Sequence, residues 1–133
     1  MDSNALLYPM IFHVCWMALL YVLLTLLRAP AIWGFDTRSG AIARWVELEP
    51  RVSANLSNQF EWPLLFYVCC VVLMQMGPLD GVQWLLAWIF IAGRVVHSLV
   101  QILTSNIRLR GLVFTINFLA VLLMWARLYG STL

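Results

Sequence analysis

Long apolar runs separated by short polar connections dominate the pattern along the chain. Four of them reach the length of about 20 mainly apolar residues that a membrane-spanning helix needs. We expect these spans at about residues 6–27, 52–76, 82–103 and 111–129, with a short interfacial helix in the first connection, around ARWVEL. The GPLDG stretch at residues 77–81 predicts a tight turn between the second and third spans. The pattern therefore predicts an all-α, integral membrane four-helix bundle that forms one domain over residues 1–133.

The composition indicates that lipid, rather than water, surrounds much of this chain. Its 133 residues are 63% hydrophobic and only 11% charged, whereas soluble domains are nearer a quarter charged. All eight positive charges are arginines and the net charge is only +2, which argues against a nucleic-acid partner. The three cysteines lie within apolar runs, where small buried hydrophobic side chains are the simplest interpretation.

The arginines also predict the orientation of the bundle. Six of them lie in or beside the first and third connections: Arg28, Arg38, Arg44, Arg51, Arg108 and Arg110. The opposite side carries only Arg127. Because positive residues stay on the cytoplasmic side, we expect both termini on the non-cytoplasmic side. The protein would then be a multi-pass protein of the bacterial inner membrane or the endoplasmic reticulum.

Three polar residues interrupt the predicted third span. Arg94, His97 and Gln101 are spaced i, i+3, i+7 and so share one helical face. Arg94 lies about 14 Å from the cytoplasmic end of the span at 1.5 Å per residue. An uncompensated arginine at such a depth costs about 2.5–3.5 kcal/mol on insertion scales. Other groups must therefore stabilise it.

A second polar stripe enters the predicted second span from the same side. Arg51, Asn55 and Asn58 follow helical spacing, and Glu61 lies three residues further on. The simplest compensation is an ion pair between Glu61 and Arg94 in a helix–helix seam. The set is larger than one pair needs, and arginines also bind carboxylates while a glutamate suits an ammonium group. Glutathione carries these groups, although the residues alone do not select it over other small anions.

These motifs resemble the MAPEG superfamily, the membrane-associated proteins in eicosanoid and glutathione metabolism. The resemblance rests on four short spans, on Arg51, Asn58 and Glu61 entering the second span, and on Arg94-x₂-His97 in the third. Its most specific part is the NQFEWPLLF run over residues 58–66. The resemblance implies a homotrimer that binds glutathione between neighbouring subunits near the cytoplasmic face.

The resemblance also implies roles for individual residues. An arginine at the start of the fourth helix would activate the glutathione thiol, and both Arg110 and Arg108 match this position by different family spacings. A guanidinium beside the sulfur favours thiolate over thiol. The candidate binding residues, from the two stripes and the resemblance, are Arg28, Arg51, Asn58, Glu61, Arg94, His97 and Gln101.

Three positions depart from the family pattern. Ala54 stands where a second arginine is usual, and Gln101 stands where a tyrosine is frequent. Phe114 replaces a tyrosine found in prostaglandin synthase and cannot donate a hydrogen bond. The resemblance is therefore stronger for the scaffold than for the catalytic set.

Two functions from different classes follow. The first, which we favour, is a glutathione-dependent membrane transferase or peroxidase-like enzyme that acts on a hydrophobic electrophile at the cytoplasmic leaflet. The alternative is a non-catalytic MAPEG-like subunit or assembly factor of a larger membrane complex, and binding of another small anion is a third interpretation.

Other polar groups within the predicted spans have simpler explanations. We expect His13 and Asn117 to form interhelical hydrogen bonds. No His/Cys cluster has metal-ligand spacing, so no metal is expected.

Overall fold

The computed structural model describes residues 2–35 and 40–132, and all regular structure within them is helical. The all-α fold class predicted from the sequence is confirmed. The elements are η1 (Ser3–Leu6), α1 (Leu7–Ile32), α2 (Gly40–Val46), α3 (Glu49–Asn58), α4 (Pro63–Gln75), α5 (Gly81–Leu103) and α6 (Ile107–Gly130).

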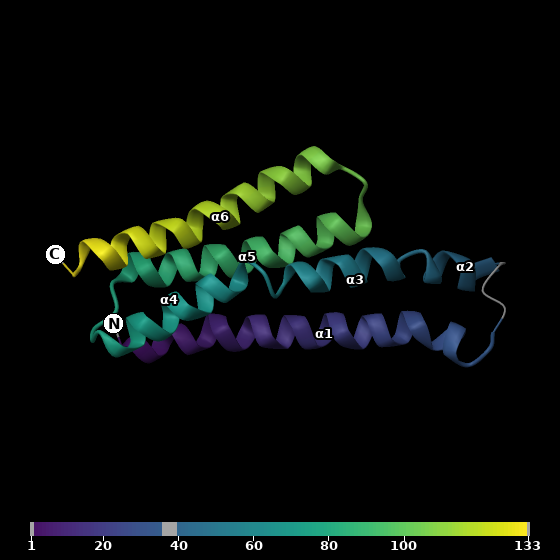
Figure 1. Ribbon diagram of the computed structural model, residues 1–133, viewed down its shortest axis with the longest axis horizontal. Helices are drawn as coiled ribbons and strands as arrows, with labels where there is room; N and C mark the ends of the chain where they lie inside the picture. The colour runs from purple at the N-terminus through teal and green to yellow at the C-terminus, as the bar shows by residue number, and fades with distance from the viewer. Residues whose placement is uncertain (1, 36–39, 133) are drawn as a thin grey trace.

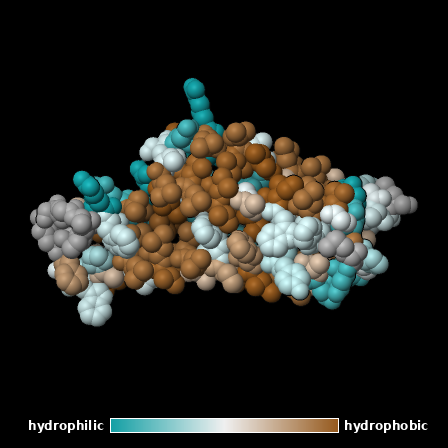
Figure 2. Space-filling view, turned by 180° about the vertical axis from the view of Figure 1, so that it is seen from behind, coloured by the Kyte–Doolittle hydropathy of each residue, from teal (hydrophilic) through white to brown (hydrophobic). Residues whose placement is uncertain are grey.

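Within the described residues, four helical stretches are long and apolar enough to cross a membrane: Ser3–Ile32, Ala43–Gln75, Gly81–Leu103 and Ile107–Gly130. At 1.5 Å per residue, the 26 residues of α1 span about 39 Å, more than the 30 Å of a bilayer core. Figure 2 shows apolar surface across the middle of the molecule and more hydrophilic surface towards both ends. The chain is therefore a multi-pass integral membrane protein.

The helices run roughly along one common direction (Figure 1). The long helix α1 lies beside α3 and α4, which follow one another along the same span, and both ends of the chain lie at the same end of the bundle. Helix α6 lies close to α5 near the chain termini and diverges from it towards the α5–α6 connection.

The packed interior consists of two apolar clusters. One joins α4, α5 and α6 near the chain termini and includes Phe66 and Phe90, whose rings stack with centroids 4.5 Å apart. The other joins α1, α3 and α5 at the opposite end and includes Leu24 and Leu56. Several buried polar residues lie between these clusters along the sequence, among them His13 on α1, Gln59 after α3, and Arg94, His97 and Ser98 on α5. A polar layer therefore separates two apolar cores.

The second span is not one continuous helix. Helix α3 ends at Asn58 and α4 begins at Pro63, with turns between them. Proline lacks the N–H that would bond to the carbonyl of Gln59, and its ring clashes with that carbonyl in a regular helix. The apolar pattern of residues 52–76 did not reveal this interruption, because the stretch as a whole is apolar enough for one span.

The fourth helix begins earlier than its apolar run. Asn106 caps α6 by accepting a hydrogen bond from the backbone N–H of Leu109 at 3.0 Å, as asparagine does at helix N-termini. Helix α6 therefore starts at Ile107, and Arg108 and Arg110 belong to its first turns rather than to a polar connection. The helix start therefore determines in which directions these two arginines point.

Helices α5 and α6 approach each other closely where Gly93 faces Asn117. A Cβ atom added to Gly93 would lie 1.7 Å from Oδ1 of Asn117. Any side chain here would overlap the facing amide unless the Asn117 side chain moved. Small residues allow such close contact between membrane helices.

Candidate functional site

The deepest charged group of the polar layer is Arg94 on α5, which is 1% exposed. Its Nε donates to Oε1 of Gln59 at 3.0 Å, and its Nη2 donates to the backbone carbonyl of Asn58 at 2.6 Å. That carbonyl lies at the end of α3, where the helix interruption removes its regular intrahelical partner. The buried arginine and the broken helix therefore stabilise each other.

Gln59, the residue after α3, is the centre of this network. Its Oε1 accepts from Arg94 and contacts Nε2 of His13, each at 3.0 Å. Its Nε2 donates to Oδ1 of Asn55 at 3.3 Å and to Oγ of Ser98 at 2.9 Å. Both hydrogens and both lone pairs of the amide are used, as burial of a polar group requires.

The network continues towards the end of the bundle that carries α3. The Oε1 atom of Gln101 accepts from Nδ2 of Asn55 at 3.0 Å and from Nδ2 of Asn58 at 3.2 Å. Gln101 therefore joins α5 to the last turn of α3. The stripes predicted from the sequence on the second and third spans do meet at these residues.

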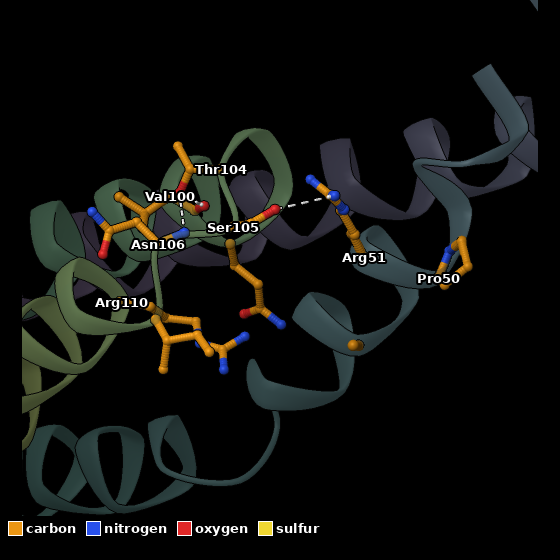
Figure 3. Close-up of a pocket in the computed structure, with 10 residues that line it drawn as sticks. Pro50, Arg51, Val100, Thr104, Ser105, Asn106 and Arg110 are labelled. Carbon is orange, nitrogen blue, oxygen red and sulfur yellow. Dashed lines mark hydrogen bonds between the residues drawn. The ribbon is translucent and has the colours of Figure 1, made fainter. Parts of the chain in front are cut away.

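A cavity of about 410 Å³ borders Gln101 and lies between α3 and the α5–α6 connection. Figure 3 shows Pro50 and Arg51 on the α3 side of it, with Ser105 and Asn106 opposite. Arg51 donates to Oγ of Ser105 at 3.4 Å across the opening (dashed in Figure 3). We call this space cavity A; its lining is Pro50, Arg51, Ala54, Val100, Gln101, Thr104, Ser105, Asn106, Ile107 and Arg110.

A second cavity, of about 560 Å³, lies between the helix interruption and the first half of α6. We call it cavity B; its lining is Asn58, Glu61, Trp62, His97, Ile107, Arg110, Gly111 and Phe114. It combines a carboxylate, a guanidinium and an imidazole with aromatic side chains. Arg110 and Ile107 line both cavities, so the two spaces meet at the start of α6.

The predicted binding residues fall into three groups in the structure. Two line cavity A, Arg51 and Gln101, and three line cavity B, Asn58, Glu61 and His97. Arg94 lies outside both linings and contacts their residues through Asn58. Arg28 also lies outside them, where it forms an ion pair with Glu49 at 2.7 Å. The set is therefore split between residues that line a cavity and residues that do not.

The two arginines proposed for thiol activation are distinguished by position. Both side chains are exposed, but Arg110 lines both cavities and Arg108 lines neither. Residues two apart on a helix point about 200° apart around its axis, so they cannot both face the same space. The geometry favours Arg110.

The predicted ion pair between Glu61 and Arg94 is wrong for a single chain. Glu61 is exposed, and within residues 2–35 and 40–132 the two side chains form no salt bridge. The physical reason is the helix interruption, which offers Arg94 a backbone carbonyl in addition to the Gln59 amide. Neutral acceptors therefore bind the buried charge, and the Glu61 carboxylate remains in cavity B.

The sequence patterns did not indicate Gln59 as part of the site, but they did predict the interhelical hydrogen bonds of His13. The expected interhelical role of His13 is confirmed, because its Nδ1 contacts the Tyr67 hydroxyl at 2.8 Å and its Nε2 contacts Gln59. The expectation for Asn117 is wrong: neither atom of its buried amide has a hydrogen-bond partner among the described residues. No group of three or more His, Cys, Asp or Glu in that part of the chain could hold a metal ion.

Comparison with known proteins agrees with the arrangement. The model of the MAPEG family matches residues 6–130, nearly the whole chain. Comparisons with curated proteins and with solved structures give no significant match. The four spans, the polar layer and this match together show that the chain belongs to the MAPEG family of membrane proteins in glutathione and eicosanoid metabolism.

Proposed function

We propose that this protein is a glutathione-dependent membrane transferase or peroxidase-like enzyme that acts on a hydrophobic electrophile at the cytoplasmic leaflet. The observation that carries the proposal is the position of Arg110 between two cavities of different chemistry. Family membership supports glutathione as the ligand. The described residues supply groups that match it.

The charges of the two cavities suit the two ends of glutathione. Arg51 in cavity A offers a guanidinium group to a carboxylate, with which arginine forms paired hydrogen bonds. Glu61 in cavity B offers a carboxylate to the ammonium group. A ligand that reaches from one cavity to the other passes Arg110, which supports this residue as the partner of the thiol.

The reaction needs a thiolate. The Arg110 guanidinium would favour loss of the thiol proton to solvent, because a neighbouring positive charge stabilises the anion. The sulfur would then attack the electrophilic carbon, forming a carbon–sulfur bond as the leaving group departs with its electron pair. Trp62 and Phe114 give cavity B an aromatic wall for the apolar part of that electrophile.

Orientation and assembly complete the proposal. The end of the bundle with Arg51 and Arg110 would face the cytoplasm, by the positive-inside rule, and both termini would face the opposite side. The resemblance to the family supports a homotrimer. A neighbouring subunit would then cover part of the exposed apolar surface of each bundle.

The test compares Arg110→Gln with Arg108→Gln and with Arg44→Gln, an exposed arginine on α2 that lines neither cavity. Glutathione binding by calorimetry, thiolate absorbance and turnover of a hydrophobic electrophile are measured in detergent. We expect Arg110→Gln to abolish the thiolate signal and turnover, with the two controls close to wild type. Full turnover in Arg110→Gln, or no glutathione binding by the folded wild type, would refute the proposal.

One observation favours the non-catalytic alternative. Both hydrogen bonds of the Arg94 guanidinium described above go to neutral groups of its own chain, so they form without a ligand. Under that alternative the protein would co-purify with a fixed partner, and neither Arg110→Gln nor added glutathione would change its thermal stability. Purification of a free homo-oligomer that glutathione stabilises would exclude it.

A further inference from the structure

We propose that Gln59 is a positioning residue for cavity B, acting through Arg94 and His13 rather than on the ligand itself. Its side chain would hold the interrupted part of the second span in the conformation that presents Asn58 and Glu61 to the cavity. The identification of the ligand as glutathione rests on the proposed function above. The positioning role rests on contacts within the chain.

The first argument is the number and direction of the contacts. Gln59 is 1% exposed, and its amide makes four hydrogen bonds to residues of α1, α3 and α5. It follows the last residue of α3, so regular helical hydrogen bonds fix its backbone only on one side. The side chain therefore supplies the restraint that the interrupted helix lacks.

The second argument concerns His13, which connects the two halves of the interrupted span. Because Oε1 of Gln59 can only accept, Nε2 of His13 must carry the proton. The Nδ1 atom then accepts from the Tyr67 hydroxyl, and Tyr67 belongs to α4. A single imidazole on α1 thus joins the first residue of the interruption to the helix after it.

The third argument is the place of the ligand-facing residues. Asn58 and Glu61 flank Gln59 on either side and both line cavity B. The Asn58 carbonyl is held by Arg94, whose Nε is in turn held by Gln59. Removal of the Gln59 amide leaves a buried N–H of Arg94 without its partner, and a guanidinium that moves to regain one releases the Asn58 carbonyl.

The chain contains a matched control. Gln83 is also a buried glutamine, 3% exposed, and its Nε2 donates to the backbone carbonyl of Met124 at 3.1 Å. It lies in the first turn of α5, at the other end of the bundle from cavity B. Gln59→Leu and Gln83→Leu therefore each remove a buried glutamine amide. The first amide belongs to the hydrogen-bond network around Arg94, and the second lies outside it.

Two readouts separate positioning from general destabilisation. The first is glutathione affinity: we expect Gln59→Leu to weaken it about tenfold or more, the scale of one lost hydrogen bond to a charged group, and Gln83→Leu to leave it unchanged. The second is independent of glutathione. The labelling rate of Glu61→Cys by a water-soluble maleimide, with the exposed Cys15 replaced by serine, should change several-fold in Gln59→Leu and not in Gln83→Leu.

The outcomes distinguish this inference from the proposed function. A changed labelling rate in a protein that binds no glutathione would refute the function and support the positioning role. Unchanged affinity and labelling in folded Gln59→Leu, or equal effects of Gln83→Leu, would overturn the inference. If Gln59→Leu does not fold, Gln59→Asn, which keeps the amide on a side chain one methylene shorter, takes its place under the same criteria.

Discussion

The guanidinium of Arg94 donates to the backbone carbonyl of Asn58 at 2.6 Å, at the point where the second span loses its helical hydrogen bonds. In a bilayer, a free backbone carbonyl and an unpaired arginine are each costly, because no water can bind them. Here each of these two groups satisfies the other. The intramembrane arginine is thus explained by the interruption of the neighbouring helix.

This pairing predicts a graded loss of stability at position 94. Arg94→Leu removes two hydrogen bonds from a charged donor and should lower the free energy of unfolding by about 3 kcal/mol, at roughly 1.5 kcal/mol or more for each bond. Arg94→Lys keeps the charge but cannot bind both acceptors with a planar fork, so an intermediate loss is expected. Denaturation of the three proteins in detergent measures both values. Equal stability of all three would contradict a structural role.

The contact between α5 and α6 predicts that Gly93→Ala is destabilising. The new Cβ would overlap the buried amide of Asn117, and overpacking of this kind costs about 1–3 kcal/mol. Gly111→Ala on α6 is the control, because its Cβ would meet nothing within 4 Å. Thermal unfolding should show a loss only in Gly93→Ala. The loss should disappear in the Gly93→Ala/Asn117→Ala double variant, and its persistence there would assign the effect to another cause.

The unpartnered amide of Asn117 predicts a stabilising substitution. Asn117 is fully buried, and its Oδ1 and Nδ2 have no hydrogen-bond partner among the described residues. Leucine has a similar shape without polar atoms, so Asn117→Leu should raise the stability by about 1–3 kcal/mol, the desolvation penalty of such a group. A higher melting temperature in detergent is the expected result. A lower one would show that the amide has a partner in the membrane.

The pair between Asp80 and Arg127 predicts a dependence of stability on pH at the other end of the bundle. The pKa of Asp80 is lowered, first because the backbone N–H of Val82 donates to its carboxylate and then because of the Arg127 guanidinium. A lowered pKa means that Asp80 stabilises the fold above about pH 4, its ordinary range, and loses this contribution as the pH falls below it. Asp80→Asn keeps a capping oxygen but not the charge.

Thermal unfolding at low ionic strength, between about pH 6 and pH 3, checks this expectation, because salt screens an exposed pair. The wild type should lose more stability on acidification than Asp80→Asn, and the two curves should converge at low pH. Parallel curves over the whole range would show that the carboxylate charge at position 80 contributes nothing.

The spans were predictable from the sequence because a bilayer requires long apolar helices, and few other structures produce such runs. The shared face of Arg94, His97 and Gln101 was equally predictable, since helical spacing fixes it. The hydrogen-bond partner of Arg94 was not predictable from the sequence. It is a backbone carbonyl together with a neutral side-chain amide at the end of α3, and a search for opposite charges overlooks both.

The start of α6 shows a second limit of pattern reading. Residues 107–110 appear as a polar connection because two arginines interrupt the apolar run, yet Asn106 caps a helix that includes them. This cap places Arg110 between the cavities and turns Arg108 away. The choice between these arginines therefore depended on a helix boundary, which hydropathy alone does not locate.

The polar layer also bears on how the chain enters the membrane. Gln59 and Asn58 precede Arg94 in the sequence, so during synthesis from the N-terminus they are made before the arginine. The third span would otherwise insert with an unpaired charge at depth. The acceptors, the Gln59 side chain and the Asn58 carbonyl, are then already in the bilayer. Arg94 can therefore form its hydrogen bonds as its own helix inserts. The order of residues along the chain thus matches the order in which the buried charge needs its partners.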